Sequence, residues 1–446
     1  MDKKNVLRMN SILLDRMKLA QQLGQQYGGD RNLYTALGYP TVISYQQFLG
    51  KYERQDIAGR IVDLPAKDTW RKPPVIMDAT SNTDEDGPAS PFVQGLQYLI
   101  DKRRLWHYMA RIDRLSGVGR FGVLLIGASG ATPLSTELPK MTRPEDVIYL
   151  SPYAEGSIQI TKTVSDPTSV RFGLPEIYSV NLGIDMPTEQ VHWSRVIHVA
   201  DDLLEDEVYG QPRMQRAYNL LEDLLKIIGG GAEATWKNMD KGLHADVRDG
   251  FDDIPDEDAL TEEIDEYMHG LRRFLRTKGI TLTPLGSDVV DPTGLFNAII
   301  GLVAASSDIP QRILLGSERG ELASSQDAST WAGQIAERQR NFAEPQLLRP
   351  LIDRLVTYGA LPAPDGGKYT VEWPSLFELN DLERADLALK MAQAAAAMSP
   401  GAPEMVMGVE YFQRVLLRMP EAEIGTENRL LDEEDASVEA ADEVEE

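Results

Sequence analysis

Apolar residues recur at helical spacing in several parts of the chain. The clearest case runs from Pro255 to Arg276, with an apolar stripe formed by Leu260, Ile264, Tyr267, Met268, Leu271 and Leu275. Acidic residues in its first turn and arginines in its last complement the helix dipole. Further helices are predicted over 44–72, 91–114, 212–240, 293–307, 328–358 and 381–398.

Proline and glycine modify three of these helices. We expect Pro65 to kink or divide the first, because proline lacks the amide donor that a helix interior uses. Pro345 and Pro350 should bend the helix over 328–358 for the same reason. The run 229–231 is three glycines and should interrupt the helix that begins at Pro212.

Short apolar runs separated by glycine and proline concentrate between residues 120 and 200. They are 122–127, 147–150, 158–160, 176–180 and 195–199, and we interpret them as a mostly antiparallel β region. Two more short strands are predicted at 280–285 and 369–373. The fold class is therefore α+β and predominantly helical.

The segment from Thr293 to Ser307 holds no charged residue and is almost entirely apolar. A helix that is apolar on all sides must be covered by neighbouring elements or by partner chains. It is too short to span a membrane, and no other stretch approaches the necessary length. The polar segment that follows, 308–327, shows no periodicity and is predicted to be a loop.

The charge and amino-acid composition argue against several classes of function. There are 45 basic and 70 acidic residues, a net charge of −25, and we expect the acidic tail over 421–446 to be disordered. A general nucleic-acid binder would instead carry a basic surface. Zero cysteines exclude thiolate metal sites and cysteine nucleophiles. No secretory signal follows Met1, so we expect synthesis in the cytoplasm.

No motif predicts catalysis convincingly. The glycines of 117–122 fit G-x-G-x-x-G but follow a helix and precede a strand, the reverse of a dinucleotide site. The tripeptide 192–194 is His-Trp-Ser, whereas a two-histidine phosphodiesterase needs two such tripeptides, one for the acid and one for the base. The acidic run 249–258 lacks the ligand spacing of a calcium loop. We expect no catalytic residue, metal or cofactor.

Three segments, in this order and spacing, resemble tailed-phage portal proteins. They are Arg60-Ile-Val-Asp-Leu-Pro-Ala-Lys-Asp-Thr-Trp-Arg71, then Arg195-Val-Ile-His-Val with Tyr209-Gly-Gln-Pro-Arg-Met214, and Ala304-Ala-Ser-Ser-Asp-Ile-Pro-Gln-Arg-Ile-Leu-Leu-Gly316. The resemblance covers about residues 45 to 395. It implies a non-enzymatic ring, typically dodecameric, at a capsid vertex, through which double-stranded DNA is packaged and ejected.

The resemblance also implies partners and parts. The partners are other copies of the chain, the terminase large subunit, head-completion or adaptor proteins, and major capsid or scaffold protein, in a virion with no membrane contact. The parts are an arm (1–44), a wing (45–254), stem helices (255–307) with a clip at 277–292, a tunnel loop (308–327), a long helix and wing strand (328–380), crown helices (381–420) and the tail (421–446). A rival mapping makes 212–239 a stem helix.

Candidate contact residues follow from this mapping. The tunnel-loop candidates are Gln311, Arg312, Ser317 and Arg319, and the two arginines could touch DNA phosphates or form ordinary loop ion pairs. Arg276 and Lys278 are clip candidates for docking a partner. An acidic body suits a channel that passes DNA without holding it. The alternatives are a phage-encoded phosphodiesterase acting on cyclic oligonucleotides of host defence, or another ring-forming virion adaptor.

Overall fold

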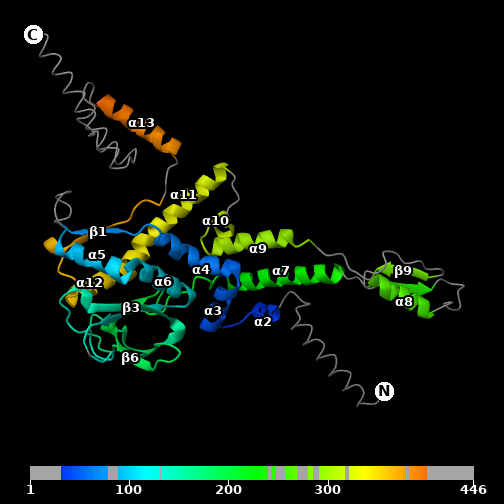
Figure 1. The fold of residues 1–446 in the computed structure, drawn as a ribbon, viewed down its shortest axis with the longest axis horizontal. Helices are drawn as coiled ribbons and strands as arrows, with labels where there is room; N and C mark the ends of the chain where they lie inside the picture. The colour runs from blue at the N-terminus through cyan, green and yellow to red at the C-terminus, as the bar shows by residue number, and fades with distance from the viewer. Residues whose placement is uncertain are drawn as a thin grey trace, which may run out of the picture. The chain divides into compact units, whose positions relative to one another are not determined.

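The computed structural model describes residues 32–78, 89–130, 132–239, 243–247, 257–268, 280–284, 291–316, 321–376 and 381–398. The chain forms two compact units, Met1–Pro374 and Ser375–Glu446. Figure 1 shows the elements of both. Among the described helices, none has the length and hydrophobicity that crossing a bilayer requires.

The described part of the first unit begins with helices. They are α2 (Leu33–Leu37), α3 (Tyr45–Arg54), α4 (Asp56–Thr69), α5 (Pro91–Arg103) and α6 (Leu105–Val118). Of these, α5 and α6 supply one side of its main core. The predicted division at Pro65 is wrong, since Pro65 lies inside α4 and the break falls at Gln55. Gln55 has extended backbone and its Nε2 donates to the Leu221 carbonyl (2.9 Å), a tertiary contact that local pattern does not reveal. The helix predicted over 91–114 is divided at Arg104, whose φ is 52°.

The predicted antiparallel β region is confirmed and forms two three-stranded sheets. One has the order β3-β2-β7, from Val147–Ala154, Gly122–Ala128 and Val196–Val199. The other has the order β4-β5-β6, from Ile158–Thr163, Pro175–Asn181 and Thr188–His192. Strand β6 escapes sequence prediction because its residues are mostly polar and exposed.

Strand β2 reads as a continuous apolar run because both of its faces are buried. Leu124 and Ile126 face the main core, which α5, α6 and residues 342–361 complete. Val123 and Leu125 face the opposite way, into a second cluster with Tyr178, Val180 and Val191 of the other sheet. A two-stranded sheet pairs β1 (Val75–Asp78) with β10 (Tyr369–Glu372).

The long C-terminal helix of this unit is continuous but changes its winding. It comprises α11 (Glu321–Arg338), the π-helix η4 (Gln339–Leu348) and α12 (Arg349–Thr357). Pro345 lies in the π-helical segment, and Pro350 lies two residues after that segment ends, at the start of α12. A π-helical segment accommodates an interior proline because the i→i−4 bonding pattern is already suspended there.

The prediction of an aperiodic loop over 308–327 is wrong for most of that segment. Residues 311–315 form α10 (Gln311–Leu315), and 321–327 belong to α11. Leu314 is buried, and Arg60 Nη2 donates to the Ile313 carbonyl (2.7 Å), so tertiary contacts hold α10 in place. Residues 317–320 lie outside the described residues.

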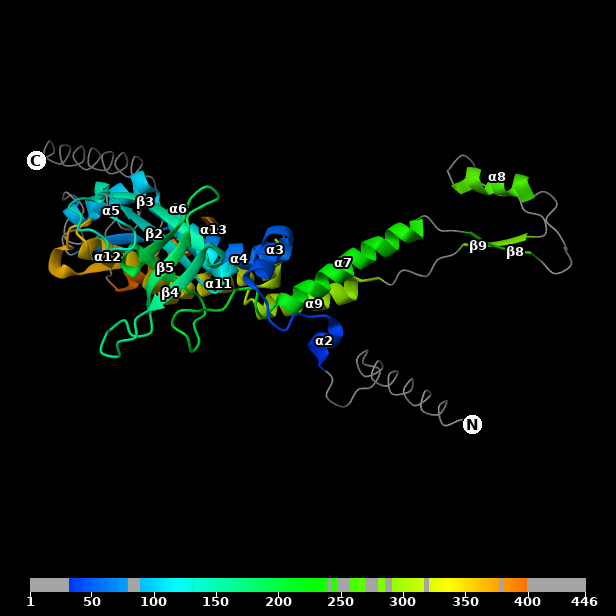
Figure 2. The same cartoon turned by 90° about the horizontal axis from the view of Figure 1, so that it is seen from below.

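Helices α7 (Tyr218–Met239) and α9 (Thr293–Ser306) pack against each other, as both views show (Figures 1 and 2). They are antiparallel, because Gly231 in the second half of α7 approaches Pro292 at the start of α9. The predicted interruption at 229–231 is wrong, since the helix runs through all three glycines. Each glycine costs only about 1 kcal/mol relative to alanine, which flanking helical turns offset.

Between α7 and α9 the chain forms β8 (Leu243–Val247), α8 (Glu257–Met268) and β9 (Ile280–Pro284), with β8 and β9 antiparallel. Of the helix predicted over 255–276, the described residues include only α8. Arg276 and Lys278 lie outside the described residues. In the second unit, α13 (Asp381–Met398) matches the predicted helix, and the tail over 421–446 is not among the described residues.

Candidate functional site

Four charged side chains form an ion network in the interior of the first unit: Asp113, Asp201, Arg213 and Arg338. Asp113 is fully buried and accepts hydrogen bonds from Arg213 Nη2 (2.6 Å) and Arg338 Nη2 (2.6 Å). Asp201 accepts from Arg213 Nη2 (2.8 Å) and Arg338 Nη2 (3.2 Å). Each guanidinium thus bridges both carboxylates, so two positive and two negative charges balance.

The ion network joins segments that are far apart in the sequence. Asp113 lies on α6, Asp201 follows β7, Arg213 precedes α7 and Arg338 ends α11. Trp70, at the end of α4, donates its indole N–H to Asp113 Oδ2 (2.8 Å). The network therefore holds α6, the segment between β7 and α7, and the long C-terminal helix against one another.

The glycine motif at 117–122 contributes to this packing. A Cβ at Gly117 would lie 2.7 Å from the Arg213 guanidinium, so a side chain there would displace an arginine held on two carboxylates. Gly122 begins β2, as predicted from the order of the elements. The motif is thus a helix-to-strand connection, and its first glycine makes room for the ion network.

Electrostatics makes the ion network stable rather than reactive. Burial raises the pKa of Asp113, but the charges of Arg338 and Arg213 outweigh that effect and lower it to about 2. Burial likewise raises the pKa of Asp201, and the same arginines bring it below its usual range. Burial acts to lower the pKa of Arg213, yet the two carboxylates raise it overall. These shifts favour the charged forms of Asp113, Asp201 and Arg213.

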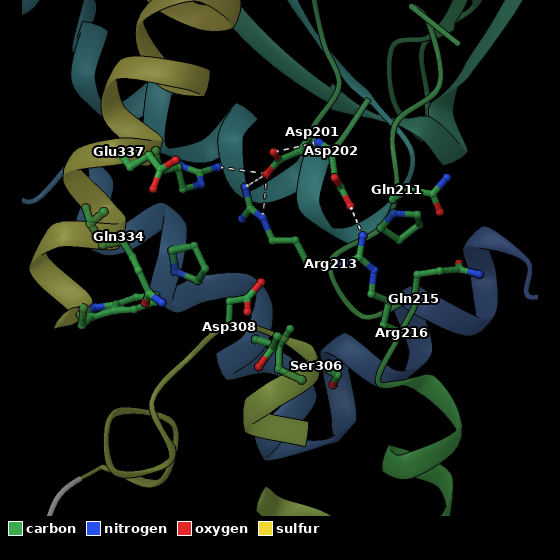
Figure 3. A pocket seen from close by; sticks show the side chains of 17 residues that line it. Asp201, Asp202, Gln211, Arg213, Gln215, Arg216, Ser306, Asp308, Gln334 and Glu337 are labelled. Carbon is green, nitrogen blue, oxygen red and sulfur yellow. Dashed lines mark hydrogen bonds and ion pairs between the residues drawn. The ribbon is translucent and has the colours of Figure 1, made fainter. Parts of the chain in front are cut away.

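A cavity of about 410 Å³ opens beside the ion network (Figure 3). Its polar wall includes Asp202, Gln211, Gln215, Arg216 and Glu337, and Arg216 pairs with Asp202 at 3.0 Å. Figure 3 shows Ser306 and Asp308, from the end of α9, on the side away from Asp201. Because the charges nearest the interior are already paired, the cavity presents no activated nucleophile.

The surface of the α7–α9 pair is apolar and open. On α7, Leu225, Ile228 and Trp236 are exposed, Trp236 to 76%. On α9, Leu295 and Leu302 are more than half exposed, and only four side chains of this charge-free helix are buried. Exposed apolar side chains on two packed helices are typical of a protein interaction surface. We call these five side chains the stem patch.

Two sequence-predicted contact residues lie on α10. Gln311 and Arg312 are exposed, and Arg312 Nε lies 3.7 Å from Asp327 Oδ2 of α11. Arg312 therefore has an acidic partner within the chain, and its contact with DNA stays a prediction. Ser317 and Arg319 are outside the described residues.

The His-Trp-Ser tripeptide has a structural role. His192 Nδ1 lies 2.8 Å from Ser194 Oγ, and the same Oγ accepts the Leu138 amide N–H (2.8 Å). Ser194 is fully buried, and the His192 ring caps a short 3₁₀ helix. Burial lowers the pKa of His192. Among the residues with defined positions, no group of three histidine, aspartate or glutamate side chains is placed to hold a metal ion.

Comparisons with known proteins come from a family model, from solved structures and from a curated protein. The model described as "Phage portal protein" matches residues 46–397. The chain is similar to one in the "Neck of empty GTA particle computed with C6 symmetry" (TM-score 0.52, 14% identity, 86% of this chain and 97% of that one). It is also similar to one in the "Neck of native GTA particle computed with C12 symmetry" (TM-score 0.51, 14% identity, 81% and 93%).

The curated relative is "Anti-CBASS protein Acb1" from Sphingomonas paeninsulae. It is 23% identical over 397 residues, which is 82% of this chain and 59% of the relative. The chain thus spans less than two thirds of that protein. The structural likenesses establish a shared fold, and the family model covers most of the sequence.

Proposed function

Because the chain belongs to the phage portal protein family, we propose that it assembles into a dodecameric ring at one capsid vertex and serves as the conduit for double-stranded DNA. Its fold is shared with chains of neck structures computed with C6 and with C12 symmetry, and the second of these matches the proposed subunit number. The protein then acts as a virion component, with the energy for packaging supplied by a separate terminase.

The observation that carries the proposal is the stem patch. Leaving Leu302 and Trp236 in water is unfavourable, at roughly 1.5–3 kcal/mol for each large apolar side chain that a neighbour could bury. A ring provides this cover symmetrically, because each subunit offers the same helix pair to the next one. No charged residue on α9 opposes such packing.

The parts of the ring follow from the chain order. Since α7 packs against α9, we adopt the rival mapping and assign these two helices to the stem. The intervening β8, α8 and β9 are then assigned to the clip. Terminase and later head-completion proteins would dock at the clip, near Arg276 and Lys278. Capsid or scaffold protein would contact the wing, and residues 381–420 would form the crown.

We assign α10 and the start of α11 to the channel wall. Arg312, with its Asp327 partner, would face DNA together with Gln311, Ser317 and Arg319. A net charge of −25 keeps the remaining surface repulsive toward phosphate, so DNA can slide without being retained.

Replacing Leu302 by Glu tests the ring. An unpaired carboxylate in a subunit interface costs about 3–5 kcal/mol, so the ring population should fall at least tenfold in native mass spectrometry and negative-stain images. The matched control is Ile184→Glu, at a fully exposed wing position outside the stem patch. An unchanged ring in Leu302→Glu would contradict the stem assignment.

Because of the curated relative, an anti-defence activity is the second candidate function of this chain. The geometry of this chain disfavours phosphodiesterase chemistry, because the hydroxyl of its single H-x-S tripeptide is buried and already bonded to a backbone amide. We therefore propose that the protein has no reaction of its own. A purified protein that stays monomeric under all conditions would justify assaying cyclic-oligonucleotide hydrolysis, with His192→Ala as the control.

A further inference from the structure

A second cavity, of about 230 Å³, lies where the β region meets α12. Arg171, from the connection between β4 and β5, and Arg354, from α12, both line it, with Trp193 between β6 and β7. The other polar lining residues include His198, Gln346 and Glu207. This cavity is separate from the ion network and from the stem patch.

Both arginines of this cavity contact the same aromatic ring. The guanidinium carbon of Arg171 lies 3.7 Å from the centroid of the Trp193 ring, and that of Arg354 lies 5.0 Å from it. Two like charges therefore both lie against one indole. Stacking on an aromatic face offsets part of their repulsion but does not neutralise either charge.

The remaining bonds of these arginines go to neutral groups. Arg354 Nη1 donates to the carbonyls of Trp193 (2.9 Å), Ser194 (3.3 Å) and Val196. Arg171 Nη2 donates to the Pro175 carbonyl (2.8 Å), while its Nε is buried and has no hydrogen-bond partner. In the described part of the chain, no ion pair joins either arginine to a carboxylate. In the ion network, by contrast, each arginine contacts two.

The missing counter-charge is reflected in the acidity of both groups. Burial, followed by the nearby charge of Arg171, lowers the pKa of Arg354 to about 10. Burial also lowers the pKa of Arg171. A shift in this direction means that the protein environment disfavours the two charged forms, and a bound anion would reverse it.

We propose that this cavity binds a phosphate-type oxyanion through Arg171 and Arg354. A phosphate group carries about 1.5 to 2 negative charges at neutral pH, which matches two guanidiniums better than a single carboxylate does. Arginine forks are suited to its oxygens, and the Arg171 Nε, which has no hydrogen-bond partner, leaves part of the donor capacity of that guanidinium unused. The cavity has room for the group with accompanying waters. This inference does not depend on the proposed ring.

Isothermal titration of the full chain with inorganic phosphate tests the site, at constant ionic strength. Wild type should bind one phosphate per subunit, and Arg171→Gln should raise the Kd at least tenfold. The matched control is Arg111→Gln, which removes an exposed arginine lying over the Tyr108 ring (5.7 Å) without touching the cavity, and should leave the Kd unchanged. Absence of binding by wild type, or equal loss in both variants, would overturn the proposal.

Two further measurements identify the ligand and guard against misfolding of Arg171→Gln. Glu207 is an exposed carboxylate at the cavity, so Glu207→Gln should tighten phosphate binding about twofold. An unchanged or weaker affinity in that variant would count against the site. Acetate should bind more weakly than phosphate. Equal affinity for acetate would replace the phosphate assignment by a carboxylate-binding site.

Discussion

At the scale of single residues, arginines in this protein occupy two contrasting environments. Arg213 and Arg338 are buried with two carboxylates each, whereas Arg171 and Arg354 face a cavity with neutral partners only. The first arrangement is complete and stabilises the fold. The second arrangement has two positive charges without a carboxylate partner. It is therefore better suited than the ion network to binding an anion.

Asp113→Asn should strongly destabilise the first unit. The substitution leaves Arg213 and Arg338 with an excess of buried positive charge, at a cost of about 3–5 kcal/mol in the free energy of unfolding. Urea denaturation at pH 7 measures this cost. Asp202→Asn, which removes an exposed partner of Arg216, is the control and should change the free energy by less than about 1 kcal/mol.

The pH dependence of the same contribution has a defined sign. The pKa of Asp113 is about 2 in the folded protein and 3.8 in its ordinary state. Its stabilising effect is therefore fully present above its ordinary pKa and is lost as the pH falls through that value toward the folded one. The difference in stability between wild type and Asp113→Asn should shrink over this acidic range, and a constant difference would contradict the assignment.

No local signal in the sequence predicts the ion network. Its members are separated by as many as 225 positions, and only the fold brings Asp113 to Arg338. Gly117 stood out in the sequence only as part of a possible dinucleotide-binding motif, not as a neighbour of Arg213. Arg312 could be named from sequence, but its partner Asp327 could not. The predicted helix began at residue 328, so Asp327 was assigned to the loop, whereas it lies on α11.

At the scale of elements, apolar pattern predicted where helices and strands lie better than where they end. β2 and α9 were recognisable because burial on several sides imposes a continuous apolar run. Breaks at Gln55 and Arg104 were missed because tertiary contacts and a left-handed backbone set them. Conversely, Pro65 and the three glycines of α7 were given more weight than their cost of a few kcal/mol could support.

The glycines of α7 should behave oppositely in the isolated subunit and in the ring. A Cβ at Gly229 or Gly230 meets no atom within 4 Å, so Gly→Ala at both should raise the subunit's melting temperature through helix propensity. If the proposed ring packs these glycines against the next subunit, the added methyl groups should weaken assembly. Gly50→Ala in α3, also in open space, should stabilise the subunit without affecting the ring.

At the scale of the whole molecule, assembly and stability should be linked. If the ring binds only folded subunits, mass action makes the melting temperature rise with protein concentration. We expect this rise for wild type and for Ile184→Glu, and its loss for Leu302→Glu. Differential scanning calorimetry over a hundredfold concentration range measures it. A melting temperature independent of concentration in wild type would mean that the subunit is stable alone.

The two strands of the β1–β10 pair are synthesised far apart in time. Val75 pairs with Glu372, so β1 leaves the ribosome about 300 residues before its partner exists. At typical translation rates, that is a wait of roughly 15 to 60 seconds with an unpaired strand edge. During this interval the nascent chain offers a site for mispairing with a second nascent chain. The nascent protein is therefore exposed to mispairing at β1 until β10, the last strand among the described residues, has been made.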